Sequence, residues 1–415
     1  MSASEGKPSA WMVSASAWLT RRRIRAHVTI LALCLWGVCA LDFATPGLFD
    51  RQGNVKFQDF LPVYVSARMI HEHRAGEIYN ATIFSDEVQA IVHRPTIRVP
   101  NLYGPQVGVL FAPMACLSFP VAAGLWSALS SLIYFICAYA IWRSCPSLSA
   151  HRGLVVLVAV AYPPFFHFFV RGQLSALVLL CFTVAWWAMR TTRPLLAGCA
   201  LGFLVFKPQF LVAIPLILLL ARTWKLFGGT VVSAMAQLVL ARLYSGSTVM
   251  ANYISMLAHP SAWISTVELN LAPVQMHSLR SFWELLLPWP TAATVLYVVC
   301  ALAVIAIAAG LWKSAAPITI RFSALLLAAV LCNPHLFIYD LLALAPAFLL
   351  LVDWSLNNLP HPAKPALAVL LYLAFLLPLF GPLAGWTHLQ LSVIAFAALL
   401  WTLRGVSIQR ATAQS

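Results

Sequence analysis

The chain has 415 residues, of which 61% are hydrophobic and only 9% are charged, whereas about a quarter of a soluble globular chain is charged. So few charges cannot cover the surface of a protein that folds in water, which excludes a soluble enzyme. A formal net charge of +14 would suggest a nucleic-acid partner in a soluble protein, but here the basic residues lie at the ends of apolar runs, as orientation signals do.

The first apolar run, residues 26–43, follows four arginines and is long enough to span a membrane. It has no convincing cleavage pattern, so we predict an uncleaved anchor after a cytoplasmic segment, residues 1–26. A stretch that holds seven of the twelve acidic residues follows and predicts a long first outer loop, residues 46–104. Pro113 and Pro120 then divide the next apolar run into a short interfacial helix and a second span.

The remaining apolar runs predict an all-α integral membrane protein with about twelve transmembrane helices. A second outer loop, residues 243–290, is rich in Trp, Pro, Ser and His. Short basic loops fall on the side of the N-terminal arginines, which places that side and the tail, residues 404–415, in the cytoplasm. A single transmembrane domain then covers residues 27–403. The predicted spans lie near residues 27–45, 121–142, 153–169, 174–189, 194–206, 208–222, 226–242, 291–311, 318–332, 338–352, 366–380 and 387–403.

Asp59 stands out among the acidic residues because its neighbours in the first outer loop are apolar and aromatic. A carboxylate that lies partly out of water has a raised pKa and can act as a general base. The alternative is a carboxylate that caps the helix containing Tyr64. On local pattern alone, both interpretations stay open.

Cations interrupt the predicted spans at the same outer face. Arg171 and Lys207 each lie between two apolar runs, and Lys207 has no acidic partner near it in the sequence. We therefore expect an external anion, such as a lipid phosphate, which Arg171 binds as a planar fork and Lys207 as a point charge. The alternative is that both side chains snorkel to lipid headgroups.

Two further polar segments contain candidate residues. In the bend that holds Asn333 and His335, the histidine can donate to a phosphate oxygen, and the nearby Asp340 can orient a basic partner. The alternative there is a bend that satisfies its own hydrogen bonds. His277, in the second outer loop, offers a polar group to a sugar or to the backbone of its own loop. The nine cysteines show no metal-type spacing, and we expect no metal and no cofactor.

These residues together suit the transfer of a sugar from a lipid phosphate, which needs a base for the acceptor hydroxyl and positive groups for the leaving phosphate. The chain also resembles glycosyltransferase family 87, membrane enzymes of the GT-C fold class that take sugars, often mannose, from polyprenyl-phosphate donors. The strings that carry this resemblance are Asp59-Phe60 with Tyr64-Val65-Ser66-Ala67, Gly76-Glu77-Ile78-Tyr79, Tyr103-Gly104-Pro105, Tyr162-Pro163-Pro164 with Gly172-Gln173, Gly198 to Gly202 before Lys207-Pro208, and Asn333-Pro334-His335 before Asp340. Leu174-Ser175 departs from the family, whose members often carry Asn there.

The resemblance implies an inverting displacement, in which Asp59 removes the acceptor proton as the lipid phosphate leaves. It favours donor-phosphate binding by Lys207, Arg171 and His335. The expected substrate-binding residues are Gln173, Tyr64, Tyr103, Asn333 and His277.

The predicted function is therefore that of a hexosyltransferase, most simply a mannosyltransferase. It would act on a glycan or glycolipid acceptor at the extracytoplasmic face of the plasma membrane, the inner membrane of a bacterium. One alternative is a transporter or flippase of a lipid-linked saccharide, which would also place charges at the ends of broken helices. Another is a structural assembly subunit, whose unpaired cations would face partner helices.

Overall fold

The computed structural model describes residues 10–97, 99–259, 273–357 and 364–414, and in the last helix the side chains as far as Ser407. Within these ranges the chain is helical and contains no strand, only two isolated β-bridges. The centre of the second predicted outer loop, residues 260–272, lies outside the described residues.

The α-helices of the first half are α1 (Ala10–Trp18), α2 (Arg21–Phe43), α3 (Leu61–His71), α4 (Ala81–Val92), α5 (Pro105–Phe111), α6 (Phe119–Trp142), α7 (Arg152–Val160), α8 (Pro163–Arg171), α9 (Ser175–Arg190) and α10 (Pro194–Gly202). Those of the second half are α11 (Ile214–Leu220), α12 (Trp224–Ser245), α13 (Ser247–Ala258), α15 (Leu279–Leu286), α16 (Pro290–Lys313), α17 (Ile318–Leu331), α18 (Ala345–Asn357), α19 (Lys364–Leu376), α20 (Ala384–Thr387) and α21 (Leu391–Gln414). Short 3-10 helices connect them: η1 (Ala75–Glu77), η2 (Ala112–Cys116), η3 (Pro146–His151), η4 (Phe203–Phe206), η5 (Pro208–Leu211), η7 (Ile338–Leu344) and η8 (Leu377–Leu383).

Each predicted span coincides with a helix or with a pair of helices in series. Among the described residues, six helices are long and apolar enough to cross a membrane, or seven if α7 and α8, which meet at a bend of 45°, form one span. The other predicted spans are shorter apolar helices. The prediction of an all-α polytopic membrane protein is confirmed, whereas the number of twelve crossings stays a prediction.

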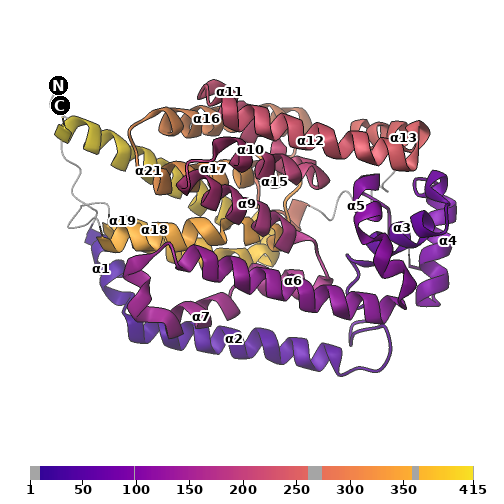
Figure 1. Ribbon diagram of the computed structural model, residues 1–415. Helices are drawn as coiled ribbons and strands as arrows, with labels where there is room; N and C mark the ends of the chain where they lie inside the picture. Colours follow the sequence, from indigo (N-terminus) through magenta and orange to yellow (C-terminus); the bar gives the residue numbers. More distant parts are fainter. Residues whose placement is uncertain (1–9, 98, 260–272, 358–363, 415) are drawn as a thin grey trace.

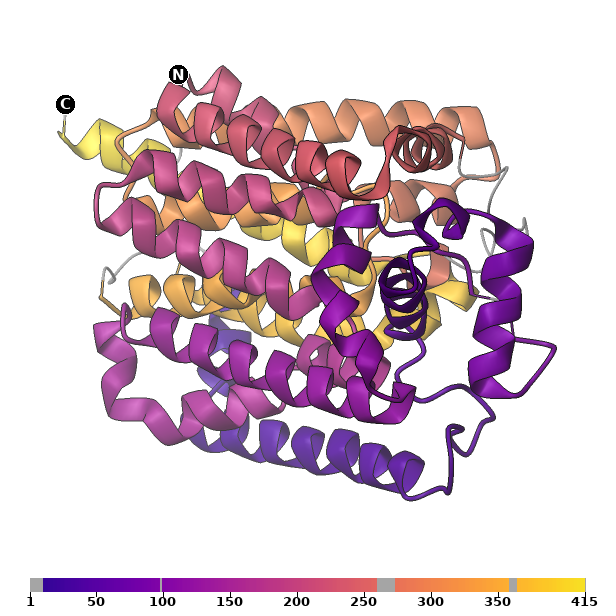
Figure 2. The same cartoon turned by 45° about the vertical axis from the view of Figure 1, so that its right-hand side comes forward.

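The long apolar helices α2, α6, α12 and α16 run along roughly the same direction (Figure 1). The helices of the first loop, α3 to α5, gather with α13 at one end of this bundle, and α1 lies at the opposite end with the C-terminal end of α21. Turned by 45°, the first-loop helices come forward as a cap on that end (Figure 2). The sequence therefore folds into a helical bundle with a small helical cap at one end.

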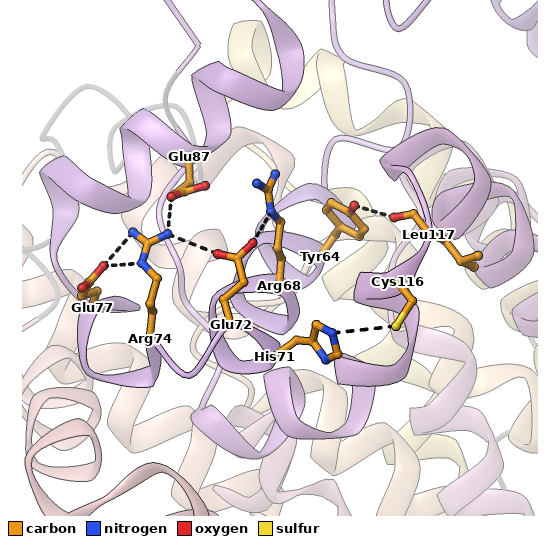
Figure 3. Close-up of polar contacts among 9 residues, drawn as sticks. All are labelled: Tyr64, Arg68, His71, Glu72, Arg74, Glu77, Glu87, Cys116 and Leu117. Atoms are coloured by element: carbon orange, nitrogen blue, oxygen red, sulfur yellow. Dashed lines mark hydrogen bonds and ion pairs between the residues drawn. The ribbon is translucent and has the colours of Figure 1, made fainter.

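The cap is held mainly by its apolar core. Nearly every residue of α3 is buried, from Leu61 to Ile70. Arg74 also bridges three carboxylates, those of Glu72, Glu77 and Glu87 (Figure 3). These ion pairs are partly exposed and screened by water, so each contributes little and burial of α3 is the larger stabilising effect.

Close approach of α10 and α12 fixes the helices that precede Lys207. A Cβ atom at Gly202 would collide with the backbone oxygen of Thr230, so only glycine permits this spacing. After Gly202 the chain tightens into η4, breaks at Lys207, and resumes as η5 and α11. The break turns the Lys207 side chain into the protein interior, where it is 3% exposed.

Candidate active site

Asp59 lies two residues before α3, and its main chain is fixed against the turn between α8 and α9. Its backbone N–H donates to the Arg171 carbonyl at 3.0 Å. The next residue of that turn, Gly172, has φ +69°, and a Cβ atom there would lie 2.9 Å from the Cβ of Phe60. Phe57 also has a left-handed backbone, with φ 57°. The turn thus accepts the Asp59 segment only because glycine occupies position 172.

The Asp59 carboxylate faces two side chains of the same turn. Gln173 donates from Nε2 to Oδ2 at 3.0 Å, and Arg171 Nη1 lies 3.9 Å from Oδ1. The Asp59 side chain is 20% exposed. The N-cap of α3 is Phe60, and Asp59 makes no capping hydrogen bond, so the alternative of a helix cap is wrong.

Two opposing effects act on the pKa of Asp59. Burial raises the pKa of this carboxyl above its ordinary value. The positive charges of Arg171 and Lys207 and the hydrogen bond from Gln173 act in the opposite direction, and the negative charge of Asp340 raises the pKa further. Burial prevails, so the carboxylate is a stronger base than one in water.

Gln173 connects Asp59 with residues from other parts of the chain. Its Oε1 accepts hydrogen bonds from the Tyr103 hydroxyl at 3.0 Å and from Lys207 Nζ at 3.2 Å. The backbone N–H of Leu174 donates to the same oxygen at 3.2 Å. Burial raises the pKa of Tyr103 well above its ordinary value, so its hydroxyl stays protonated and donates. The structure therefore brings Asp59, Gln173, Tyr103 and Lys207 into one network.

Lys207 has no acidic partner near it in the sequence, but the expectation that it therefore needs an external anion is wrong, because a distant carboxylate balances its charge. Its ammonium lies 2.5 Å from Oδ1 of Asp340, whose side chain is 2% exposed. Ser175 contacts both members of this pair, since its hydroxyl donates to Asp340 at 2.9 Å and lies 3.3 Å from Lys207 Nζ. Snorkelling of Lys207 is excluded as well, because the side chain is buried. Asp340 is thus the counter-charge of Lys207, although 133 residues separate the two in the sequence.

Arg171 and His335 lie nearer to solvent than this pair. The Arg171 side chain is 35% exposed and has Asp59 as its ion-pair partner among the described residues. His335 is half-buried, and its ring packs against Phe337. Burial lowers the pKa of His335, and the charges of Arg280 and Lys207 lower it further while Asp340 opposes them, so the ring is neutral at neutral pH.

The structure gives two predicted substrate-binding residues other hydrogen-bond partners. The Tyr64 hydroxyl donates to the Leu117 carbonyl at 2.6 Å (Figure 3). His277 is 2% exposed, and its Nδ1 lies 2.8 Å from the Ser392 hydroxyl. Burial lowers the pKa of His277 to about 3, so this ring is neutral. These contacts connect the first-loop cap and the start of α21 to the rest of the fold.

Asn333, the remaining predicted residue, is fully buried at the end of α17. Its Oδ1 accepts the backbone N–H of His335 at 2.9 Å, which closes the bend. Its Nδ2 has no hydrogen-bond partner among the described residues. A buried amide with a spare donor is uncommon.

An apolar cavity of about 380 Å³ lies beside the network and is partly open to the outside. Leu174 and Phe206, which adjoin Gln173 and Lys207 in the sequence, form part of its wall. The other lining residues come from α5, α9, η4 and α12: Gln106, Val107, Val109, Leu110, Leu177, Phe203, Gln237, Leu240, Ala241 and Tyr244. Its mostly apolar lining suits a hydrocarbon chain.

Residues 101–334 match the family model of glycosyltransferase family 87, which is more than half of the chain. The chain belongs to glycosyltransferase family 87. The resemblance noted in the sequence is thereby confirmed, and the protein is a membrane glycosyltransferase. No curated protein and no solved structure matches this family 87 chain.

The residues of the network fall on both sides of the boundary of that match. Tyr103, Gln173 and Lys207 lie within the residues that match family 87, whereas Asp59 and Asp340 lie outside them. The candidate base is therefore tied to the matched region by contacts in three dimensions: the hydrogen bond from Gln173 and the backbone contact with Arg171.

Ser175 was not among the predicted site residues. Its position in the sequence, directly after an apolar residue and at the start of α9, looks like an ordinary helix terminus. The departure from the Asn of relatives at Leu174-Ser175 was the available signal. No group of three His, Cys, Asp or Glu side chains with metal-binding geometry occurs in the described ranges.

Proposed function

We propose that this family 87 enzyme transfers a hexose, with mannose as the first sugar to test, from a polyprenyl-phosphate donor to a hydroxyl of a glycan or glycolipid acceptor. The observation that carries the proposal is the position of Asp59. Its carboxylate is 20% exposed, has a raised pKa and lies between Arg171 and Gln173. Leu174, the residue after Gln173, forms part of the wall of the apolar cavity. A base, a cation and an apolar cavity at one place suit a lipid-linked sugar donor.

The proposed reaction is a single displacement with inversion at the anomeric carbon. Asp59 removes the proton of the acceptor hydroxyl, and the acceptor oxygen forms a bond to the anomeric carbon. The bond between that carbon and the phosphate oxygen breaks, and the electron pair leaves with the polyprenyl phosphate. Asp59 then returns the proton to water.

Arg171 is the cation best placed for the donor phosphate. It is 35% exposed, and its distance of 3.9 Å to Asp59 leaves its N–H groups available for a bidentate contact. His335 adds a neutral ring that can donate one hydrogen bond. Lys207 is further from this role than the sequence suggested, because Asp340 already balances its charge. We therefore assign Lys207 to the electrostatic support of the site.

We assign the polyprenyl chain to the apolar cavity. Its wall includes Leu240 and Tyr244 of α12, which are 65% and 60% exposed on the outside of the bundle. A chain that enters from the lipid would place its phosphate beside Gln173, where Leu174 and the network meet. Tyr103 and Asn333 are the proposed contacts for the sugar or acceptor. Gln173, Tyr64 and His277 stay as weaker candidates, because these three side chains already have partners.

The proposed topology is a GT-C type bundle of twelve spans in the inner membrane of a bacterium, with the active site outside. The transmembrane domain covers residues 27–403, and the segments 1–26 and 404–415 are cytoplasmic. An even number of crossings is supported by α1 and the C-terminal end of α21, which lie at one end of the bundle (Figure 1). The cap with Asp59 lies at the opposite end, away from the basic N-terminal segment.

The test is transfer by purified protein from radiolabelled polyprenyl-phosphate hexoses to a membrane-extracted acceptor pool. We expect Asp59→Asn to abolish transfer and to keep the monodisperse elution of the wild-type protein in detergent. Asp86→Asn is the matched control, because Asp86 lies exposed on α4 of the same loop and should leave transfer unchanged.

Three outcomes would contradict the proposal. Near-normal transfer by Asp59→Asn would remove Asp59 from the mechanism. Movement of the lipid-linked sugar across vesicles without a new glycosidic bond would favour a flippase. A wild-type protein that neither transfers nor moves a lipid-linked sugar, but co-purifies with other membrane proteins, would favour an assembly subunit.

A further inference from the structure

The amide of Gln173 has one orientation that its surroundings permit. Its Oε1 receives the Lys207 ammonium and the Leu174 backbone N–H, both at 3.2 Å. These two groups can only donate, so an amide nitrogen in that place would leave the Leu174 N–H without its described acceptor and would face the Lys207 ammonium with a second donor. The Tyr103 hydroxyl reinforces the same arrangement at 3.0 Å. The amide nitrogen must therefore point to the other side, where Asp59 Oδ2 accepts it at 3.0 Å.

The two oxygens of Asp59 consequently differ. Oδ2 is occupied by the Gln173 amide, whereas the described contact of Oδ1 is that with Arg171 Nη1, which at 3.9 Å is too long for a hydrogen bond. An acceptor hydroxyl that approaches Asp59 finds Oδ1 available. The amide holds one oxygen of the carboxylate, and the backbone hydrogen bond to the Arg171 carbonyl at 3.0 Å fixes the main chain that carries it.

We infer that Gln173 is a positioning residue, which holds Oδ2 of Asp59 so that Oδ1 takes the proton of the acceptor hydroxyl. The inference rests on the proposed function, since it assigns a role within that same reaction. Lys207 and Tyr103 act one step further away, because they fix the amide and do not contact the carboxylate. The buried Asp340 keeps the Lys207 ammonium in place.

The choice of substitution separates this role from simple support of the fold. Gln173→Glu keeps an oxygen that accepts from Lys207, Tyr103 and Leu174, but replaces the amide N–H that faces Asp59 with a second carboxylate oxygen. Gln173→Met removes both the accepting oxygen and the donating N–H, and it adds no titratable group. Gln52→Glu is the matched control, because Gln52 is an exposed glutamine of the same first loop.

Two measurements apply to these variants. The first is the pH dependence of kcat and of KM for the donor in the transfer assay. Loss of a hydrogen bond to a charged group changes an equilibrium or a rate by about 10- to 100-fold, so we expect kcat of Gln173→Glu to fall by about that factor. The acidic limb of its pH–kcat profile should move to higher pH. KM for the donor should change by less than about threefold, since the donor contacts are kept.

The second measurement is infrared titration of the Asp59 carboxyl band, taken as the difference from Asp59→Asn, and it needs no substrate. In Gln173→Met this band should titrate at higher pH than in the wild type, because the N–H that favours the ionised form is gone. Gln52→Glu should leave kcat, KM and the titration unchanged.

The two ideas fail differently. A wild-type-like pH profile for Gln173→Glu, or an unshifted Asp59 band in Gln173→Met while the wild-type protein transfers sugar, overturns the positioning role alone. Absence of transfer by the wild-type protein contradicts the proposed function and, with it, the catalytic part of the inference. If Gln173→Met does not fold, Gln173→Glu decides the question, since it keeps every acceptor contact of the amide.

Discussion

Removing the ammonium of Lys207 should destabilise the protein more than removing both charges of its pair with Asp340. The two side chains are 3% and 2% exposed, so in Lys207→Met the Asp340 carboxylate stays buried with the Ser175 hydroxyl as its described side-chain partner. One uncompensated charge of a buried pair costs about 3–5 kcal/mol. We therefore expect Lys207→Met to lower the free energy of unfolding by that amount.

Asp340→Asn should cost less. The ammonium left behind still contacts Gln173 and Ser175, and it lies 5.3 Å from the centre of the Tyr339 ring. These contacts offset part of the lost attraction, so we expect a loss of about 2–3 kcal/mol. The double variant contains neither charge. Its loss should be smaller than that of Lys207→Met alone, so the sum of the two single losses should exceed it by more than the loss of about 2–3 kcal/mol expected for Asp340→Asn.

The assay is unfolding of detergent-solubilised protein by added SDS, followed by tryptophan fluorescence for the wild type and the three variants. Lys313→Met is the control, because Lys313 is exposed at the end of α16 and should change stability by less than about 1 kcal/mol. Additive losses in the double variant, or a Lys207→Met protein as stable as the wild type, would refute the assignment of a structural ion pair.

The same variants separate two roles of Lys207. If the lysine supports the site through Asp340 and Gln173, transfer should be impaired through kcat, with little change in KM for the donor. If it binds the donor phosphate directly, KM rises in Lys207→Met and stays raised by the same factor in the double variant, even where stability recovers.

Three further predictions follow from the geometry. Burial raises the pKa of Asp59, so the folded protein binds this proton more tightly than the unfolded chain, and the ionised carboxyl costs stability above its folded pKa. Asp59→Asn should therefore melt at a higher temperature than the wild type at neutral pH, and the difference should disappear in acid; a constant difference across the pH series would count against it. Gly172→Ala should lower the free energy of unfolding by about 1–3 kcal/mol and reduce transfer, because φ is +69° and the new methyl group would collide with Phe60. SDS unfolding and the transfer assay check this prediction. Leu177→Trp, on the wall of the apolar cavity, should raise KM for a long-chain donor but not for a short-chain analogue, and equal KM changes for both donors would remove the chain from this cavity.

The helices were predictable because bilayer-spanning helices leave a long apolar signal in the sequence. Every predicted span coincides with a helix, and Pro113 and Pro120 lie in the region where α5 and η2 give way to α6. Asp59 could also be singled out, since a carboxylate among aromatic residues is unusual. Each of these features depends on neighbours in the sequence, which is why the sequence alone was sufficient for them.

The pairing of Lys207 was not predictable in the same way. A lysine at a break between apolar runs has the same local sequence whether it faces headgroups or a buried carboxylate. Asp340 is 133 residues away, and only the packing of η7 against α8 and α9 brings it to the lysine. The role of Gln173 depended on the same packing, because three segments supply the donors that orient its amide.

The charges of the site suggest how the proposed reaction is balanced. Asp59, Arg171, Lys207 and Asp340 sum to zero before any donor binds, with Lys207 and Asp340 paired in the interior. When Asp59 takes the acceptor proton, its negative charge disappears, and the leaving phosphate gains a second charge, to about −1.5 to −2 at neutral pH. Arg171 then faces a neutral carboxyl and a more negative phosphate. In the proposed reaction, the proton transfer thus weakens the attraction of Arg171 to Asp59 and strengthens its attraction to the leaving phosphate. Arg171 then stabilises the transition state more than it stabilises the bound donor.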